Sequence, residues 1–203
     1  MKLILATNNK HKVMEFSRIL SPLGIEVISQ SEAGIKIDVE ENADSFEGNA
    51  RLKAKAIYEI SGIPTIADDS GLEVYALNNA PGVYSARYGG SECKNDKERY
   101  EKLLSEMKDV PEIDRGARFV CSICLVMSNE KEYNMTGICE GMIAYEPHGE
   151  NGFGYDPIFM VNDKSFSELS DREKDQISHR GNALKKLQEI LTLNELDSER
   201  KSI

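Results

Sequence analysis

The sequence predicts an α/β fold built on a mixed β-sheet with flanking helices, and three observations support this. A short apolar run at residues 2–6 is followed by apolar residues at helical spacing and then by a second short strand-like segment. That strand–helix–strand order is typical of a parallel sheet. Two long strand-like segments, 117–127 and 131–144, are separated by only three residues and therefore predict a hairpin. A parallel start combined with an antiparallel hairpin makes the sheet mixed.

The first half of the chain predicts two helices and further strands. The first helix follows the N-terminal apolar run, and Pro22 and Gly24 end it. A second helix fits residues 45–61, where apolar side chains recur on one face. Segments 64–67 and 71–77 are strand candidates, so the acidic stretch between them lies at a strand end.

The second half predicts two more helices around the hairpin. An exposed helix fits residues 95–110, and a glycine-rich loop, 148–157, follows the hairpin. Ser170 and Glu173 have the spacing of a capping box. A last helix fits residues 182–193.

Length and charge limit the class of protein. The 203 residues suffice for one domain with its own core, which we place at 1–193, followed by a polar tail at 194–203. There are 25 Lys and Arg against 35 Asp and Glu, a formal net charge of −10. An acidic protein has no general attraction for polyanions, so neither nucleic acid nor a membrane is expected as a partner.

The apolar runs of the sequence predict a cytoplasmic protein. No apolar run approaches the roughly 20 residues that span a bilayer, and the N-terminal run is shorter than that of a secretory signal. The four cysteines are then expected to be reduced. Cys121 and Cys124 lie within a strand pattern, where positions three apart point to opposite faces, so a shared zinc is not expected.

The segment 7–12, Thr-Asn-Asn-Lys-His-Lys, is a candidate anion site. It lies between a buried strand and a helix, where free backbone N–H groups and the helix dipole favour negative charge. The glycines of a Walker loop or a dinucleotide fingerprint are missing. A polar turn with a helix cap is the alternative interpretation.

Two acidic pairs are candidates for a magnesium site. Asp68 and Asp69 at a strand end can hold a hard cation and orient water, and an Asx-turn, which is common, is the alternative interpretation. Glu40 and Glu41 alone are typical of a solvated loop. Close in space to Asp69, they could complete the metal site.

The glycine-rich loop can recognise a planar ring. Phe153 and Tyr155 can stack on such a ring, and Asp156 can accept hydrogen bonds from its edge. Rings that join the core are the alternative. A further basic cluster lies near the start of the last helix and comprises Lys174, His179 and Arg180.

Taken together, six segments resemble the inosine/xanthosine triphosphate pyrophosphatases, which remove non-standard purine nucleotides. The segments are LATNNKHKVMEF, FEGNARLKA, ADDSGLEV, APGVYSARY, NGFGYDPIF and EKDQISHRGNAL, in this order over residues 5–184. The resemblance implies a two-lobed α/β fold around a long mixed sheet, with the active site in the cleft between the lobes, and a homodimer. It also implies magnesium-dependent hydrolysis of ITP, dITP or XTP to the monophosphate and pyrophosphate.

The resemblance further assigns roles to individual residues. Asp69 would bind magnesium and act as the base that activates water, and either Glu40 or Glu41 would be the second acidic ligand. Ser70 would contact the nucleotide. The triphosphate would be held by Thr7, Asn8, Asn9, Lys10, His11, Lys12 and Lys53, with Lys12 as the main cation. The base pocket would comprise Phe153, Gly154, Tyr155, Asp156, Lys174, His179 and Arg180.

Three other functions compete with this interpretation. A Maf-like pyrophosphatase of modified nucleotides would share the fold, but the FGYDP and SHR motifs argue against it. A non-catalytic nucleotide sensor would not need the acidic pairs, which are present here. A phosphoryl transferase would differ in its products, because it would release a phosphorylated acceptor.

Overall fold

The computed structural model describes residues 1–200, with side chains described up to residue 192. Its strands are β1 (Lys2–Leu5), β2 (Glu26–Ser29), β3 (Thr65–Val74), β4 (Ala80–Pro81), β5 (Gly116–Ser128), β6 (Lys131–Ile143), β7 (Phe159–Val161) and β8 (Lys164–Ser165). Its helices are α1 (Lys10–Leu20), α2 (Phe46–Ser61), α3 (Asp96–Glu106), α4 (Asp171–Ile177) and α5 (His179–Arg200).

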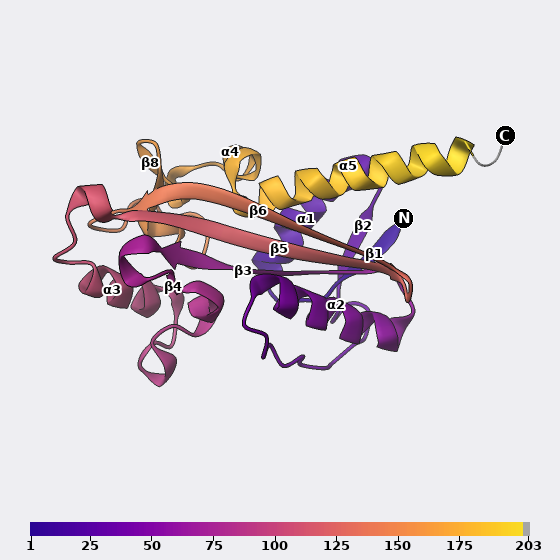
Figure 1. The fold of residues 1–203 in the computed structure, drawn as a ribbon, viewed down its shortest axis with the longest axis horizontal. Coiled ribbons are helices and arrows are strands. Elements are labelled where there is room, and N and C mark those ends of the chain that lie inside the picture. The colour runs from indigo at the N-terminus through magenta and orange to yellow at the C-terminus, as the bar shows by residue number, and fades with distance from the viewer. Residues whose placement is uncertain (201–203) are drawn as a thin grey trace.

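All strands belong to one mixed sheet of eight strands, in the order β2-β1-β3-β5-β6-β7-β8, with β4 paired to β3. β1 pairs in parallel with β2 and β3, whereas β3, β5, β6, β7 and β8 pair antiparallel in turn. Figure 1 shows β5 and β6 running from the part that holds β1, β2 and α2 to the part that holds α3 and β4. The predicted α/β fold with a long mixed sheet is confirmed.

One predicted feature of the sheet was wrong. The segments 64–67 and 71–77 were expected to be separate strands, but β3 is continuous from Thr65 to Val74. Asp68 and Asp69 therefore lie within a strand. Pairing with β5 continues through this acidic segment and satisfies its backbone groups, which outweighs the low strand propensity of the sequence.

The cleft in the molecule follows from the unequal lengths of β1 and β3. β1 pairs with β3 only at Thr65 and Ile66, and β4 pairs with it only at Glu73 and Val74. Between these points the edge of β3 has no strand neighbour on this side within the described chain. The loop that follows β1 faces this open edge, so it comes close to the acidic segment of β3.

Local capping explains where the helices begin. The Asn9 side chain accepts hydrogen bonds from the backbone N–H groups of His11 and Lys12, at 2.9 and 3.3 Å, and starts α1. The predicted capping box of Ser170 and Glu173 is present at the start of α4. α5 begins at His179, earlier than predicted, and continues to Arg200. Residues 194–200 of the expected polar tail are thus helical, and 201–203 lie outside the described residues.

Helices cover both faces of the sheet (Figure 1). α1 and α5 pack against the face that carries Cys121, and α2 packs against the face that carries Cys124. Both thiols are buried and free, as are those of Cys93 and Cys139. The alternation along β5 thus separates the CxxC cysteines, as predicted.

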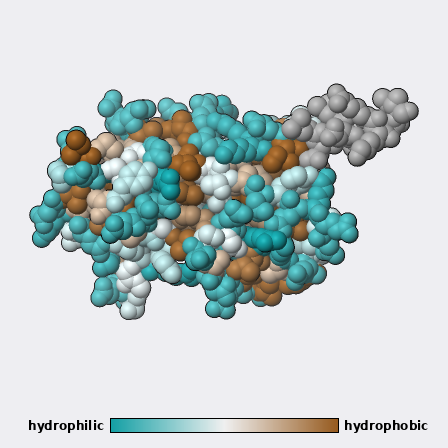
Figure 2. All heavy atoms as spheres, in the orientation of Figure 1, coloured by the Kyte–Doolittle hydropathy of each residue, from teal (hydrophilic) through white to brown (hydrophobic). Residues whose placement is uncertain are grey.

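The surface is mostly polar. In Figure 2 hydrophilic residues cover most of the visible face, with apolar residues gathered in smaller patches between them. Within the described chain, no helix has the length and hydropathy needed to cross a bilayer.

Candidate active site

A cavity of about 370 Å³ opens along the edge of β3. Its size falls within the range of small-molecule sites. It brings together most of the predicted site residues: Thr7, Asn8, Asn9, Lys12, Lys53, Glu41, Asp69, Ser70, Phe153, Gly154, Tyr155, Asp156, Lys174, His179 and Arg180. Three of the predicted residues, Lys10, His11 and Glu40, do not line this cavity.

The three basic residues at the start of α1, Lys10, His11 and Lys12, point in different directions. Lys12 lines the cavity, and its Nζ lies 3.0 Å from Asp68 Oδ1. Lys10 is exposed. The His11 ring stacks on the Phe153 ring, with centroids 5.2 Å apart and planes 19° apart. Because successive helical residues point about 100° apart, only one of these three side chains faces the cavity.

Asp69 lies beside two groups that hold its carboxylate. Its Oδ2 accepts a hydrogen bond from Asn49 Nδ2 at 3.0 Å, and its Oδ1 lies 3.8 Å from Lys53 Nζ. The same Nζ lies 2.5 Å from Glu41 Oε1. Burial raises the pKa of Asp69 above its ordinary value, although the charge of Lys53 acts in the opposite direction.

Glu40 and Glu41, which the sequence could not separate, differ in their surroundings. Glu41 is half-buried, lines the cavity and pairs with Lys53. Glu40 is exposed and does not line it. The geometry therefore favours Glu41 over Glu40 as the second acidic residue of a metal site with Asp69.

Asp68 belongs to a separate charge network. Neighbouring residues of a strand point to opposite faces, so Asp68 faces α1 and α5 while Asp69 faces α2. Its Oδ2 accepts from Arg180 Nη2 at 3.0 Å. Burial works to raise the pKa of Asp68, but the charges of Lys12 and Arg180 outweigh it and hold the pKa far below its ordinary value. Asp68 is thus a fixed negative charge that orients the two cations.

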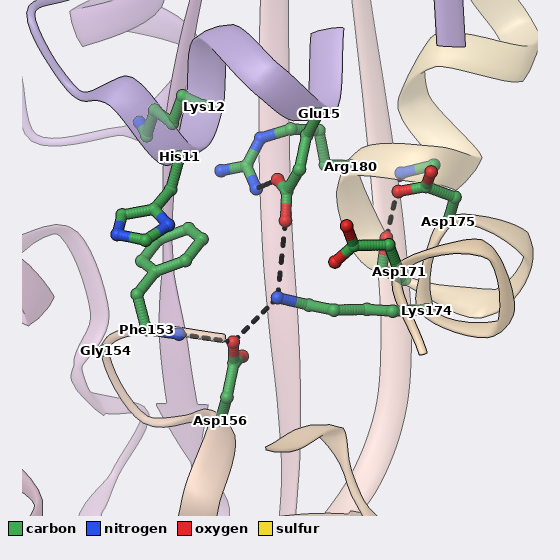
Figure 3. Close-up of polar contacts among 12 residues, drawn as sticks. His11, Lys12, Glu15, Phe153, Gly154, Asp156, Asp171, Lys174, Asp175 and Arg180 are labelled. Atoms are coloured by element: carbon green, nitrogen blue, oxygen red, sulfur yellow. Dashed lines mark hydrogen bonds and ion pairs between the residues drawn. The ribbon is translucent and has the colours of Figure 1, made fainter. Parts of the chain in front are cut away.

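Lys174 connects the glycine-rich loop to α1, as Figure 3 shows. Its Nζ lies 2.7 Å from Asp156 Oδ2 and 3.3 Å from Glu15 Oε1. Asp156 Oδ2 also accepts from the backbone N–H of Phe153 at 2.8 Å. Asp156 was predicted to meet the edge of a base. In this structure its Oδ2 is engaged in holding Lys174 and the loop.

His179 has an unused polar atom at the cavity. The ring is buried and stacks on Phe119, with centroids 4.6 Å apart and planes 13° apart. Its Nδ1 has no hydrogen-bond partner among the described residues. Burial and the nearby positive charge of Arg180 hold the pKa of His179 well below its ordinary value, so the imidazole is neutral. A neutral imidazole can donate or accept a hydrogen bond.

Two site residues escaped the sequence analysis. Glu15 is buried and pairs with both Lys174 and Arg180. Asn49 is fully buried and holds Asp69. Each is a polar residue at a buried position of an amphipathic helix, and such a position could have been flagged from the helical spacing.

The donor set suits magnesium better than a tightly caged metal. The described residues contain no cluster of three His, Cys, Asp or Glu side chains that could hold an ion on its own. Magnesium commonly takes one or two carboxylates and completes its shell with water and substrate phosphates. Asp69 and Glu41, both within 4 Å of Lys53 Nζ at the cavity wall, fit that requirement.

Comparison with known proteins gives concordant matches. The sequence matches the Ham1 family over residues 3–190. A dITP/XTP pyrophosphatase of Desulforamulus reducens is 50% identical over 193 residues, covering 94% of this chain and 96% of that protein. A dITP/XTP pyrophosphatase of Bacillus subtilis is 48% identical over 190 residues, covering 93% and 96% respectively. The solved structure of the Staphylococcus aureus Ham1 protein aligns with a TM-score of 0.85 at 43% identity, covering 96% of this chain and 100% of that one.

Proposed function

This chain belongs to the Ham1 family, and we propose that it hydrolyses dITP, XTP and ITP to the monophosphate and pyrophosphate. The observation that carries the proposal is one cavity lined by two chemically different groups of residues. Asp69, Glu41 and Lys53 form one group, and the other includes His179, whose Nδ1 has no hydrogen-bond partner among the described residues. The first group suits a triphosphate and the second suits a purine edge, so we call them the phosphate end and the base end of the site.

At the phosphate end, the chain supplies both charge and a base. Lys12 and Lys53 neutralise part of the triphosphate charge. Asp69 accepts the proton of the attacking water. Asn49 fixes the orientation of this carboxylate. Asp69 and Glu41 would hold magnesium, which when bound would supply Lewis-acid stabilisation of the phosphate oxygens.

At the base end, selectivity arises from the pattern of donors and acceptors. Hypoxanthine and xanthine present a 6-oxo acceptor and an N1–H donor, whereas adenine presents an amino donor and a bare N1. A buried donor directed at the oxo edge would be left unpaired by adenine, which is costly, and His179 Nδ1, which has no hydrogen-bond partner among the described residues, can be that donor. Guanine shares the oxo edge and must be refused at its 2-amino group.

The test is a substrate panel in the presence of magnesium. We expect kcat/KM for dITP and XTP to exceed that for dATP by about a hundredfold or more. Asp69→Asn should retain the fold and lose nearly all turnover. Glu47→Gln, which removes an exposed carboxylate at the start of α2, is the matched control and should keep turnover. Equal efficiency with dATP would refute the base assignment, and full activity of Asp69→Asn would refute the catalytic one.

The proposal includes the cellular setting that the sequence predicts, a cytoplasmic homodimer. The four cysteines are free in the structure, which supports the location. Light scattering of the purified protein measures the oligomeric state directly.

A further inference from the structure

α4, which carries the site residue Lys174, buries no apolar side chain. It has seven residues, and the only buried one is Lys174. No apolar side chain of α4 is buried, so hydrophobic packing contributes little to its position. Its place relative to α1 therefore depends on its junction with α5, one residue away, and on polar contacts.

The polar contacts between α4 and α1 come from two residues of α1 that lie about one helical turn apart, Glu15 and Arg18. Glu15 pairs with Lys174, whose Nζ also reaches Asp156 (Figure 3). Arg18 lies one helical turn further along α1. It contacts both carboxylate oxygens of Asp175, with its Nη2 2.9 Å from Oδ1 and its Nε bonded to Oδ2.

Arg18 also reaches a second carboxylate of α4. Its Nη1 donates to Asp171 Oδ2 at 2.9 Å. The Asp175 side chain is 15% exposed, so this bidentate pair is partly shielded from solvent. Bidentate Arg–carboxylate pairs fix orientation as well as distance, which a single lysine contact does not. Arg18 itself does not line the nucleotide cavity.

We propose that Arg18 is a positioning residue for the base end of the site: by clamping Asp171 and Asp175 it fixes α4 and thereby sets the place of Lys174. The inference rests on the proposed function for the identity of the ligand. It predicts that Arg18 affects recognition of the base and leaves recognition of the phosphates nearly unchanged. Lys53 is held by Glu41 and Asp69, outside the ion pairs of α4, and Lys12 is carried by α1 itself and does not depend on the place of α4.

The experiment compares dITP with a ligand that has no base. For Arg18→Ala we expect KM for dITP to rise about tenfold, the factor that corresponds to 1.4 kcal/mol, with kcat nearly unchanged. The inhibition constant of inorganic tripolyphosphate should stay within about twofold of the wild-type value. Arg18→Lys should recover part of the loss, because it keeps the charge and loses the bidentate geometry.

A matched control lies on α4 itself. Arg172→Ala removes the same charge from an exposed position that makes no ion pair within the described chain, so it should leave both constants unchanged. The exchange Arg18→Asp with Asp175→Arg should restore part of the affinity for dITP. If Arg18→Ala does not fold, Asp175→Asn provides the same comparison with a smaller change.

The outcomes are distinct. An unchanged KM for dITP in Arg18→Ala would overturn the proposal. An equal loss of affinity for dITP and tripolyphosphate would overturn it too, since it would indicate a general structural role. If the wild-type protein does not hydrolyse dITP, the proposed function fails instead. The dissociation constant of dIMP, measured by calorimetry for wild type and Arg18→Ala, then tests the role of Arg18 without turnover. We expect weaker binding to Arg18→Ala, and equal binding would overturn the proposal.

Discussion

At the scale of single residues, Asp68 and Asp69 are neighbours in the chain with different surroundings. Asp68 is enclosed by Lys12 and Arg180, which keep it ionised. Asp69 faces the other side of β3, where burial raises its pKa. Strand alternation alone produces this division, since consecutive side chains leave opposite faces of the sheet. One carboxylate can thus organise cations while the other serves as a base.

His179 predicts a pH dependence of stability. Its folded-state pKa lies well below the ordinary value of about 6.5, so below that pH the unfolded chain binds a proton that the native ring does not. The free energy of unfolding should therefore fall as pH drops below about 6.5, with His179 contributing up to about 1.4 kcal/mol per pH unit. Urea unfolding at pH 7.5, 6.5 and 5.5 measures this slope.

Substitution isolates the contribution of this ring. His179→Gln should show a shallower slope than wild type over the same interval, whatever its absolute stability. His148→Gln replaces a histidine that is not buried and should keep the wild-type slope. Parallel slopes for wild type and His179→Gln would show that His179 is not the group responsible.

At the scale of elements, the position of α5 is fixed by the close approach of its backbone to that of β6. A Cβ added at Gly137 in β6 would lie 2.1 Å from the carbonyl oxygen of His179 and 2.3 Å from the backbone nitrogen of Ala183. Neither atom can move without moving α5. Because α5 begins with His179 and Arg180, this contact also sets the position of the base end.

Gly137→Ala should consequently be strongly destabilising. We expect a loss of about 3 kcal/mol or more in the free energy of unfolding, measured by urea denaturation, because α5 must separate from β6. Gly24→Ala is the comparison. Its φ is +70° but an added Cβ meets nothing within 4 Å, so only backbone strain of about 1 kcal/mol applies. Similar losses for the two variants would contradict the packing argument.

Most elements could be predicted from the sequence because their apolar residues recur at a regular spacing. The hairpin of β5 and β6, the capping box of α4 and the ends of α1 all have local signals. β3 was divided wrongly because the acidic segment has low strand propensity and its pairing with β5 is not local. Local patterns likewise could not decide between Glu40 and Glu41.

At the scale of the whole molecule, the site exists only because distant segments meet where β1 stops and β3 continues. Arg180 contacts Asp68 across 112 positions of sequence, and Lys174 contacts Glu15 across 159. No periodicity in the chain encodes such a meeting, so local patterns could not predict these contacts. Glu15 and Asn49 lie within the quoted motif segments, but only the structure assigns them roles and places Asp68 and Asp69 on separate sides of β3.

The proposed reaction is hydrolysis of a non-standard purine triphosphate at the bond between the α- and β-phosphates. Phosphorus NMR of the products formed from dITP and magnesium tests it most directly. We expect dIMP and pyrophosphate in equal amounts, with no orthophosphate. Accumulation of dIDP with orthophosphate would show that a different bond is cleaved.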